Sequence, residues 1–396
     1  MNMNEQMKES EESILHTYNR FPVVFEKGQG CYLYDSEGKE YLDFAAGIAV
    51  NSLGYHYPGY DEALKDQIDK LMHISNLYYN EPIIEAGAKL VKASTMSKAF
   101  FTNSGTEAIE GALKAAKKYA YVRDGHADHE IIAMNHSFHG RSIGALSVTG
   151  TAHYREPFEP LMGGVKFADF NDLESVKAQI TDKTCAIITE VVQGEGGIYP
   201  AKKEFLEGLR QICDEKDIML IFDEIQCGMG RTGHYFAWQA YGVQPDIMTS
   251  AKALGCGVPV GAFVLSEKAA KASLEPGDHG TTYGGNPFVC AAVSKVFDIY
   301  ENDKIIEHVQ EMTPYLEQKL DEIVAKHECA ATRRGMGFMQ GIVIQGRPVG
   351  EVVKAALAKG LLVISAGSDV LRIVPPLVIT KEHIDKMAAI LDECME

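Results

Sequence analysis

Two charged residues, Asp223 and Lys252, each follow an apolar run of strand-like composition. Asp223 comes directly after residues 218–222, and Lys252 follows residues 246–249 just before a glycine-rich stretch. A lysine amine forms a Schiff base with an aldehyde, and a carboxylate keeps a pyridine nitrogen protonated, so pyridoxal phosphate chemistry needs this pair. Both residues follow predicted strands, where open α/β sheets bind ligands. A lysine alone after a strand is usually an exposed charge, so the interpretation depends on the pair and on the segments below.

Residues 103–108 combine small and polar side chains at a predicted strand-to-helix junction. They read Asn-Ser-Gly-Thr-Glu-Ala and include Ser104, Gly105 and Thr106. Backbone N–H groups at a helix N-terminus attract an anion, so this segment is a candidate phosphate site. A capped helix start without a ligand explains the same residues equally well.

Three further segments carry residues suited to a flat ring or an anion. Phe138 is suited to stacking on a ring, and Arg141 to holding a carboxylate through two parallel hydrogen bonds. A core phenylalanine beside a surface arginine is the plainer alternative. Glu195 lies in the glycine-rich loop 190–197, where a glutamate is by default a solvated charge. Residues 280–287 offer hydroxyls and bare backbone, which suit either a second set of phosphate contacts or a turn.

Other patterns do not predict a site. Residues 228–233 match G-x-G-x-x-G, but the glycines begin five residues after the strand and no clear helix follows, so the dinucleotide interpretation is rejected. His126 and His129 lie in a polar stretch that favours a solvated loop over metal ligands, and we expect no metal. The eight cysteines form no C-x-x-C pair and are typical of reduced thiols.

The segments that must position these residues alternate between strand-like and helix-like patterns. Strands are predicted at residues 98–102, 130–134, 184–189, 218–222, 246–249 and 262–265. A helix is predicted over 106–121, and an amphipathic helix is predicted from Phe205, Leu206, Leu209, Ile212 and Cys213. Strands separated by helices predict an α/β fold whose mostly parallel sheet is covered on both faces.

The C-terminal hundred residues indicate a smaller α+β domain. A helix is expected near 305–323, apolar segments follow at 338–344 and 352–357, and short strands are expected at 361–365 and 370–374. Thr380 is a candidate N-cap for a last helix. Residues 28–44 resemble a hairpin that joins this part. We therefore expect an N-terminal segment (1–55) packed with a small domain (296–396), and a large cofactor-binding domain (56–295).

Composition excludes two classes of partner. Of the 396 residues, 46% are hydrophobic and 23% charged, which is typical of a globular protein. A net charge of −17 leaves no basic face for nucleic acid. The apolar stretches are too short to span a membrane, and residues 1–13 lack the pattern of a signal peptide, so we expect a cytoplasmic protein.

These segments, from residues 17–23 through 371–377, together resemble the class III (ω-amino) transaminases, which are pyridoxal-phosphate enzymes of fold type I. The resemblance covers nearly the whole chain. Departures from the family pattern are Val191 in place of a proline, Ile109 in place of an asparagine, and Tyr55 and Tyr57 in place of histidines. None of them falls on the residues that resemble the catalytic set.

The resemblance implies a role for each candidate residue. Lys252 would bind the cofactor aldehyde as an imine and then shuttle the substrate proton, while Asp223 would pair with the pyridinium nitrogen. The other implied cofactor contacts are Ser104, Gly105 and Thr106 at the phosphate, Phe138 over the ring, Gln226 at the ring hydroxyl, and Thr282 reaching the phosphate from the second subunit of a homodimer.

For the substrates, the resemblance implies two carboxylate-binding arginines. Arg141 would hold the carboxylate remote from the reacting amine, and Arg372 would hold the α-carboxylate of glutamate or 2-oxoglutarate. Glu195 would mask Arg372 while the other amino donor reacts. Tyr18 and Ile48 would line the donor tunnel, and an apolar residue at position 48 disfavours free ornithine.

The implied reaction is ping-pong transfer of the 5-amino group of N2-acetyl-L-ornithine to 2-oxoglutarate. It yields N-acetylglutamate 5-semialdehyde and glutamate, as in arginine biosynthesis. Succinylornithine, N-succinyl-diaminopimelate, ornithine and 4-aminobutyrate are alternative donors, and putrescine is disfavoured because it lacks a carboxylate for Arg141. An aminomutase of the same fold and a non-catalytic homologue are the rivals from other classes.

Overall fold

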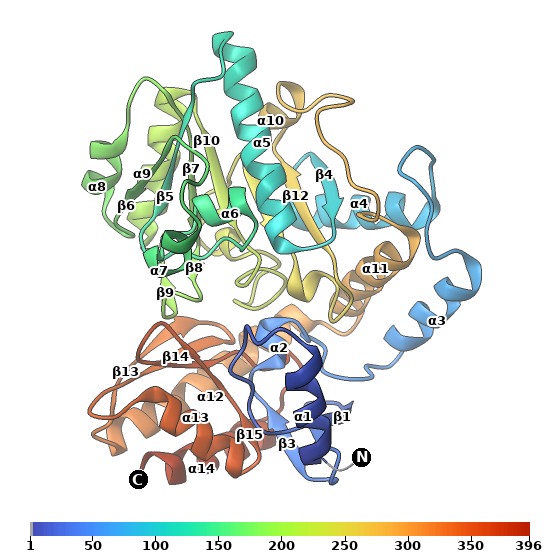
Figure 1. The fold of residues 1–396 in the computed structure, drawn as a ribbon, viewed down its shortest axis with the longest axis vertical. Helices are drawn as coiled ribbons and strands as arrows, with labels where there is room; N and C mark the ends of the chain where they lie inside the picture. Colours follow the sequence, from blue (N-terminus) through green and yellow to red (C-terminus); the bar gives the residue numbers. More distant parts are fainter. Residues whose placement is uncertain (1–2) are drawn as a thin grey trace.

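The computed structural model describes residues 3–396, so residues 1–2 of the predicted N-terminal segment lie outside it. Figure 1 shows an upper part built on a seven-stranded sheet and a lower part that combines the two ends of the chain. The upper sheet has the order β4 (Lys98–Thr102), β12 (Gly261–Leu265), β11 (Ile247–Ser250), β10 (Met219–Asp223), β7 (Thr184–Glu190), β5 (Glu130–Met134) and β6 (Val165–Ala168). Only β12 runs antiparallel to its neighbours. The predicted α/β fold with a mostly parallel sheet is confirmed.

Both faces of this sheet are buried, which explains the unbroken apolar runs in the sequence. Alternate residues of β10 belong to two different cores: Met219 and Ile221 lie in one, Leu220 and Phe222 in the other. This alternation follows from the two-residue period of a strand. The helices of this part are α3 (Tyr60–Lys70), α4 (Glu81–Ser94), α5 (Gly105–Asp124), α6 (Ile143–Ser147), α7 (Ala152–Arg155), α8 (Leu173–Gln179), α9 (Lys203–Lys216), α10 (Glu267–Lys271) and α11 (Pro287–Asn302).

Short elements complete the upper part. A two-stranded hairpin joins β8 (Val192–Gln193) to β9 (Tyr199–Pro200), and 3₁₀ turns span Glu156–Phe158, Ala237–Ala240 and Lys252–Leu254. Helix α5 packs against β11 and β12, and α11 packs against α3 and α4. All five residues of the predicted amphipathic helix are buried on α9, which confirms that prediction.

The lower part contains two four-stranded sheets. The first has the order β1 (Phe25–Gln29), β2 (Tyr32–Asp35), β3 (Glu40–Asp43) and β15 (Leu361–Leu362), so the predicted N-terminal hairpin does pair with a C-terminal strand. The second has the order β13 (Ala330–Met336), β14 (Met339–Ile344), β17 (Val370–Ile373) and β16 (Ile364–Ala366). The helices are α1 (Met3–Ser13), α2 (Ala46–Ala49), α12 (Ile305–Lys326), α13 (Val349–Ala358) and α14 (Lys381–Met395). The domain boundaries at residues 55 and 295 stay a prediction.

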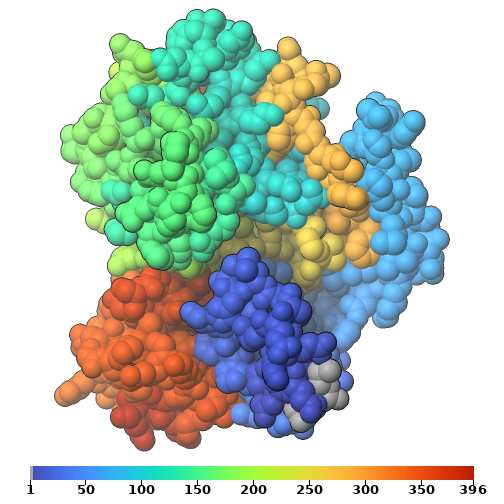
Figure 2. All heavy atoms as spheres, in the orientation of Figure 1, coloured from blue at the N-terminus to red at the C-terminus, as the bar shows by residue number. Residues whose placement is uncertain are grey.

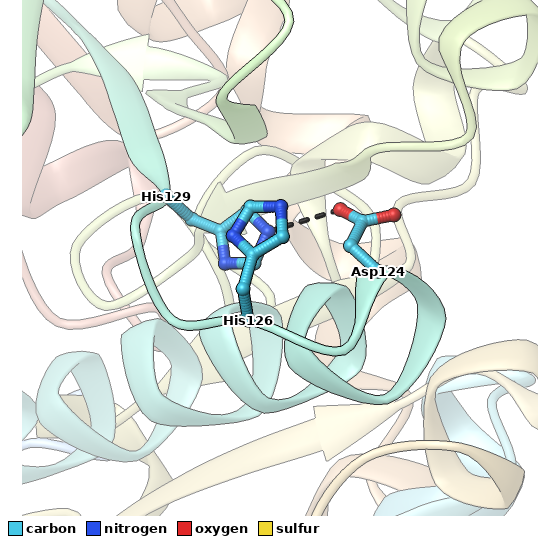
Figure 3. Close-up of side chains that lie close together, drawn as sticks. All are labelled: Asp124, His126 and His129. Carbon is cyan, nitrogen blue, oxygen red and sulfur yellow. Dashed lines mark hydrogen bonds and ion pairs between the residues drawn. The ribbon is translucent and has the colours of Figure 1, made fainter.

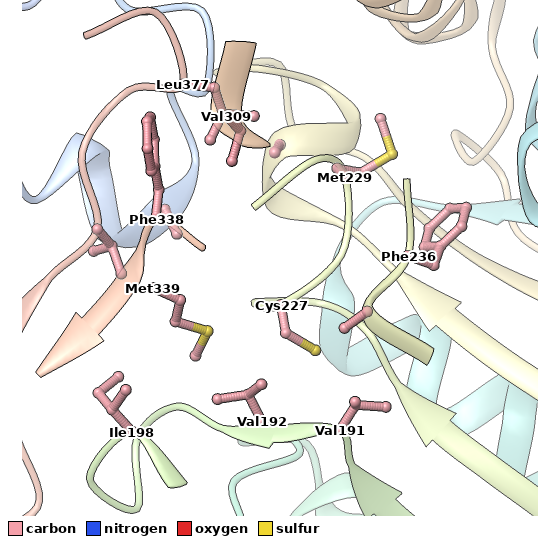
Figure 4. Close-up of a cluster of buried hydrophobic side chains, with 14 of the residues drawn as sticks. Val191, Val192, Ile198, Cys227, Met229, Phe236, Val309, Phe338, Met339 and Leu377 are labelled. Carbon is pink, nitrogen blue, oxygen red and sulfur yellow. The ribbon is translucent and has the colours of Figure 1, made fainter. Parts of the chain in front are cut away.

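A buried apolar cluster joins the two parts. Figure 4 shows Val192 and Cys227 of the upper part facing Met339 and Phe338 of the lower part. The buried Arg231 crosses the same junction, because its guanidinium donates to the carbonyl oxygens of Phe338 and Pro375. Residues 228–233 therefore connect the two parts, a role that the sequence analysis did not anticipate. In the space-filling view of Figure 2 the surface is hollowed between the upper part and the N-terminal segment.

No helix among residues 3–396 combines the length and the apolar character needed to cross a bilayer.

Candidate active site

A cavity of 490 Å³ opens where the parallel strands of the large sheet end. Asp223 is the last residue of β10, Glu190 is the last residue of β7, and Lys252 follows β11 by two residues. The carboxyl ends of parallel strands meet at one edge of a sheet, and ligands of open α/β sheets bind there. Eight of the thirteen predicted site residues line this cavity: Ser104, Gly105, Thr106, Phe138, Arg141, Asp223, Gln226 and Lys252.

Asp223 is a buried carboxylate in a fixed hydrogen-bond network. Its Oδ2 accepts from His139 Nδ1 at 2.7 Å, and its Oδ1 accepts from the backbone N–H of Ile225 at 3.0 Å and from Thr249 Oγ1 at 3.3 Å. The charge and hydrogen bond of Asp223 raise the pKa of His139 although burial opposes its protonation. The result is a rigid acceptor at the cavity wall, suited to a protonated ring nitrogen.

Lys252 is half-buried and lines the cavity. Burial lowers the pKa of its amine to about 8, and the Arg372 guanidinium acts in the same direction. Its φ of 49° lies in the left-handed region, which costs energy for a residue with a side chain. A lysine with a lowered pKa is partly neutral near physiological pH and can act as a nucleophile.

Two buried titratable residues of the cavity were not assigned a role from the sequence. His139 pairs with Asp223, as described above, and its Nε2 has no hydrogen-bond partner among residues 3–396. Burial raises the pKa of Glu190 to about 7, while the carboxylate accepts backbone hydrogen bonds from Phe138 and Gly194. One signal was available for Glu190 in the sequence, because it directly follows the predicted strand 184–189, where ligands of open α/β sheets bind.

The N-terminus of α5 faces the cavity with small residues. Ser104 caps the helix through its hydroxyl, and a Cβ on Gly105 would come within 2.9 Å of Ile225. The hydroxyl of Thr106 lies 2.7 Å from that of Ser142, which in turn donates to the carboxylate of Glu110. These bonds fix the first turn of the helix, whose free N–H groups and dipole suit a phosphate.

The two arginines of the site differ in their partners. Among residues 3–396, the guanidinium of Arg141 makes no ion pair or hydrogen bond and lies over the rings of Phe138 and Tyr154. Arg372 is buried, and its Nη1 donates to Glu195 at 3.0 Å and to Gln226 Oε1 at 3.2 Å, while Nη2 donates to the carbonyl of Ser365. One arginine is therefore free in the cavity and the other is covered by a carboxylate.

Five predicted site residues are not among those that line the cavity of this chain. Two of them, Arg372 and Glu195, pair with each other next to Gln226, and the other three lie on the surface. Thr282 is exposed in the loop before α11, and Tyr18 and Ile48 are exposed as well. Val50, two residues after Ile48, does line the cavity. A single chain therefore does not test the predicted roles of these three residues.

The loop after α5 differs from the fully solvated loop predicted there. Asp124, His126 and His129 come close together, as Figure 3 shows, and His129 is buried with its Nε2 2.9 Å from Asp124 Oδ2. The two oxygens of Asp124 also accept from Arg123 at 2.6 Å each. Since this guanidinium already neutralises the carboxylate, the cluster is an ion pair with two stacked imidazoles.

Comparison with known proteins places the whole chain in one family. The aminotransferase class-III profile matches residues 14–395. The acetylornithine aminotransferase of Clostridium acetobutylicum is 47% identical over 388 residues, covering 98% of this chain and 100% of that protein. The succinylornithine transaminase of Yersinia pseudotuberculosis is 44% identical over 94% of this chain and 92% of its own length. A solved ornithine aminotransferase of Toxoplasma gondii, with pyridoxal phosphate at partial occupancy in its active site, has a TM-score of 0.95 at 28% identity, covering 100% of this chain and 94% of that one.

Proposed function

The chain belongs to the class-III aminotransferases, and from this premise we propose that it moves the 5-amino group of N2-acetyl-L-ornithine to 2-oxoglutarate. The products are N-acetylglutamate 5-semialdehyde and glutamate, which places the reaction in arginine biosynthesis. The similarity to acetylornithine aminotransferases over nearly the full length supports this donor. The contrast between the unpaired Arg141 and the masked Arg372 is the structural observation that carries the proposal.

Pyridoxal phosphate is the cofactor, and the residues of the cavity fit it. The cavity offers an amine of lowered pKa on Lys252, a buried carboxylate on Asp223 and the free N-terminus of α5. These groups suit an aldehyde, a pyridine nitrogen and a phosphate respectively. When bound, the cofactor supplies an electron sink for the negative charge that develops on the substrate carbon.

Six residues of this chain would hold the cofactor besides Lys252. Asp223, fixed by His139, would keep the ring nitrogen protonated, because a buried carboxylate stabilises a cation next to it. The remaining contacts are Phe138 on the ring, Gln226 at the ring hydroxyl, and Ser104, Gly105 and Thr106 at the phosphate. Lys252 Nζ, with a pKa of about 8, would accept and return the proton of the substrate carbon near neutral pH.

The two arginines would select different carboxylates in the two halves of the reaction. Arg141, which has no partner among residues 3–396, would bind the carboxylate of acetylornithine away from the reacting amine. Arg372 would stay covered by Glu195 during this half and would bind the α-carboxylate of 2-oxoglutarate once Glu195 moves aside. A buried arginine without a carboxylate is costly, so the exchange of partners keeps Arg372 neutralised throughout.

Tyr18 and Ile48 would line the donor tunnel. Tyr18 and Ile48 are exposed in the single chain, at 72% and 46%, and a second subunit would have to cover them for a tunnel to form. An apolar residue at position 48 favours a donor whose α-nitrogen is acetylated and uncharged over free ornithine.

We further propose that the enzyme is a homodimer whose sites are shared. An exposed apolar surface, the tyrosine patch, consists of Leu71, Met72, Leu77, Tyr78, Tyr79, Ile84 and Tyr283, which are 42–95% exposed. Asn76 donates to the carbonyl of Gly284 at 2.8 Å, and the His73 ring lies 5.3 Å from that of Tyr283, so the patch adjoins Thr282. Patches of this kind mark interfaces, and Thr282 would reach the phosphate bound by the other subunit.

The free thiols support our proposal for the compartment. All eight cysteines are free, and seven of them are buried. Reduced thiols are typical of the cytoplasm, which we propose as the location.

A donor panel tests the substrate. Initial rates with 2-oxoglutarate should be highest for acetylornithine, compared with succinylornithine, N-succinyl-diaminopimelate, ornithine, 4-aminobutyrate and putrescine. A preference for another of these amines would overturn the donor but not the reaction class. Turnover of an amine without any keto acid would instead favour an aminomutase.

Sedimentation tests the homodimer. Tyr79→Asp should shift the protein from dimer to monomer, since it places a charge in the tyrosine patch. Tyr121→Asp is the matched control, because Tyr121 is 48% exposed at the end of α5 and lies outside the patch.

Thr282→Ala should weaken cofactor binding about tenfold or more if its hydroxyl contacts the phosphate. A monomeric wild-type enzyme, or unchanged cofactor affinity in Thr282→Ala, would contradict the shared site.

A further inference from the structure

Arg141 is held in the cavity by aromatic rings from two different segments. Its Cζ atom lies 4.0 Å from the ring centroid of Tyr154 and 5.4 Å from that of Phe138. Tyr154 belongs to α7, and its ring meets the Phe138 ring edge-on, with centroids 5.8 Å apart and an interplanar angle of 82°. The three side chains therefore form one contact group at the cavity wall, with Tyr154 closest to the charge.

The kind of contact determines what Arg141 can still do. A guanidinium held by aromatic rings spends no N–H group on an oxygen acceptor, so its N–H groups stay available for a carboxylate. Among residues 3–396, no carboxylate lies within ion-pair distance of Arg141 and no group accepts a hydrogen bond from it, so stacking is the contact that positions it. Arg372, in contrast, is fixed by hydrogen bonds to Glu195, Gln226 and Ser365.

We propose that Tyr154 is a positioning residue that holds Arg141 for the carboxylate of the amino donor and so helps to set donor specificity. This inference rests on the proposed function. The aromatic ring carries the effect, because the Tyr154 hydroxyl makes no hydrogen bond with residues 3–396 while its face covers the guanidinium. Phenylalanine at this position should therefore preserve the contact, and leucine or methionine should lose it.

The test compares two donors that differ in one group. N2-acetylornithine and N-acetyl-1,4-diaminobutane share the reacting amine and the acetamide, but only the first has a carboxylate. We expect Tyr154→Leu and Tyr154→Met to raise KM for acetylornithine by roughly 2- to 5-fold, the range of a cation–π contact at an exposed site, because Arg141 is exposed in the single chain. KM for the diamine derivative and both kcat values should stay unchanged. If the diamine derivative is not turned over, its competitive inhibition constant takes the place of KM.

Two controls separate positioning from a general structural role. Tyr154→Phe should restore the wild-type KM. Phe167→Leu removes the stacking partner of the next residue, Arg155, whose Cζ lies 4.1 Å from the Phe167 ring centroid, and it should leave both KM values unchanged. Neither Phe167 nor Arg155 lines the cavity.

The outcomes distinguish this inference from the function on which it rests. If wild type does not prefer acetylornithine over the diamine derivative, the carboxylate clamp fails and the role of Tyr154 fails with it. If wild type prefers acetylornithine but Tyr154→Leu and Tyr154→Met keep that preference, only the positioning role is overturned. An equal loss for both donors would also overturn it, since Tyr154 would then act through Phe138 on the cofactor.

Discussion

Replacing Glu195 by glutamine tests the exchange of partners at Arg372 most directly. The change keeps the size and hydrogen-bonding oxygen of the side chain but removes the charge that faces Arg372 Nη1 at 3.0 Å. The side chain of Arg372 is 3% exposed and that of Glu195 is 32% exposed, so the pair is only partly screened by water. Two charges at this distance attract by about 5.5 kcal/mol at an effective dielectric constant of 20.

Only part of this attraction appears as a net effect. Exposure of Glu195 and the cost of desolvating both groups reduce it to about 1–3 kcal/mol. Without the charge, Arg372 is covered less tightly while acetylornithine reacts, and less energy is needed to uncover it for glutamate. Each half-reaction is measured by its rate constant divided by its apparent dissociation constant. The value for glutamate divided by the value for acetylornithine should therefore rise by roughly 5- to 150-fold.

Stopped-flow absorbance of the bound cofactor measures each half-reaction separately. Glu130→Gln is the control, because Glu130 pairs with Lys166 at 2.7 Å. It is the first residue of β5, whereas the cavity lies at the carboxyl ends of the strands. That variant should leave the ratio unchanged. A ratio within about twofold of wild type in Glu195→Gln would refute the reasoning, since Arg372 would then need no masking.

Three further predictions concern charged side chains that the fold removes partly or fully from water. Burial lowers the pKa of Lys252 to about 8, so its charge destabilises the cofactor-free fold by roughly 3 kcal/mol below pH 8, and this cost disappears as pH rises towards 10.5. Calorimetry should therefore show a higher melting temperature for Lys252→Met than for wild type at pH 7. The same difference in melting temperature at pH 10 would contradict the lowered pKa. Asp223→Asn should lower the rate of transamination by roughly a hundredfold or more in steady-state assays, because an amide cannot stabilise a protonated ring nitrogen. Activity within tenfold of wild type would exclude this role of the Asp223 carboxylate. Arg231→Ala removes two charged hydrogen bonds across the junction of the two parts, each worth about 1.5–3 kcal/mol, so the melting temperature should fall by several degrees at a fixed scan rate. An unchanged melting temperature would show that the apolar cluster of Figure 4 is enough to hold the two parts together.

The central strands were predictable because their burial leaves a direct mark on the sequence. Residues 131–134 are apolar and buried, and the strand has the predicted bounds 130–134, since both faces of the sheet are covered. Two edge strands were missed for the opposite reason. In β6 only Ala168 is fully buried, and β13 carries the polar run Thr332, Arg333 and Arg334, so neither shows a pattern that distinguishes it from a loop.

The site was predictable as far as topology brings chain segments together. Asp223 and Lys252 follow neighbouring parallel strands, so their proximity follows from the alternation of strands and helices alone. His139 lies 84 residues from Asp223 in sequence, and its role depends on a hydrogen bond that no local pattern encodes. Thr282, Tyr18 and Ile48 remain predictions because their partners would belong to a second subunit.

In the proposed reaction, the arrangement of charges would let one cavity serve two substrates. Arg141 rests on aromatic rings, which hold it in place without neutralising it, so it is ready for a carboxylate in either half-reaction. Arg372 is more deeply buried, and leaving it without an anion would cost several kcal/mol, so it needs Glu195 whenever no α-carboxylate is present. The same guanidinium also lowers the pKa of Lys252, and in the proposed exchange a substrate carboxylate in place of Glu195 would keep the total charge around that amine constant. A movable Glu195 would therefore let the lysine keep similar proton affinity with both substrates, which a permanently open arginine would not.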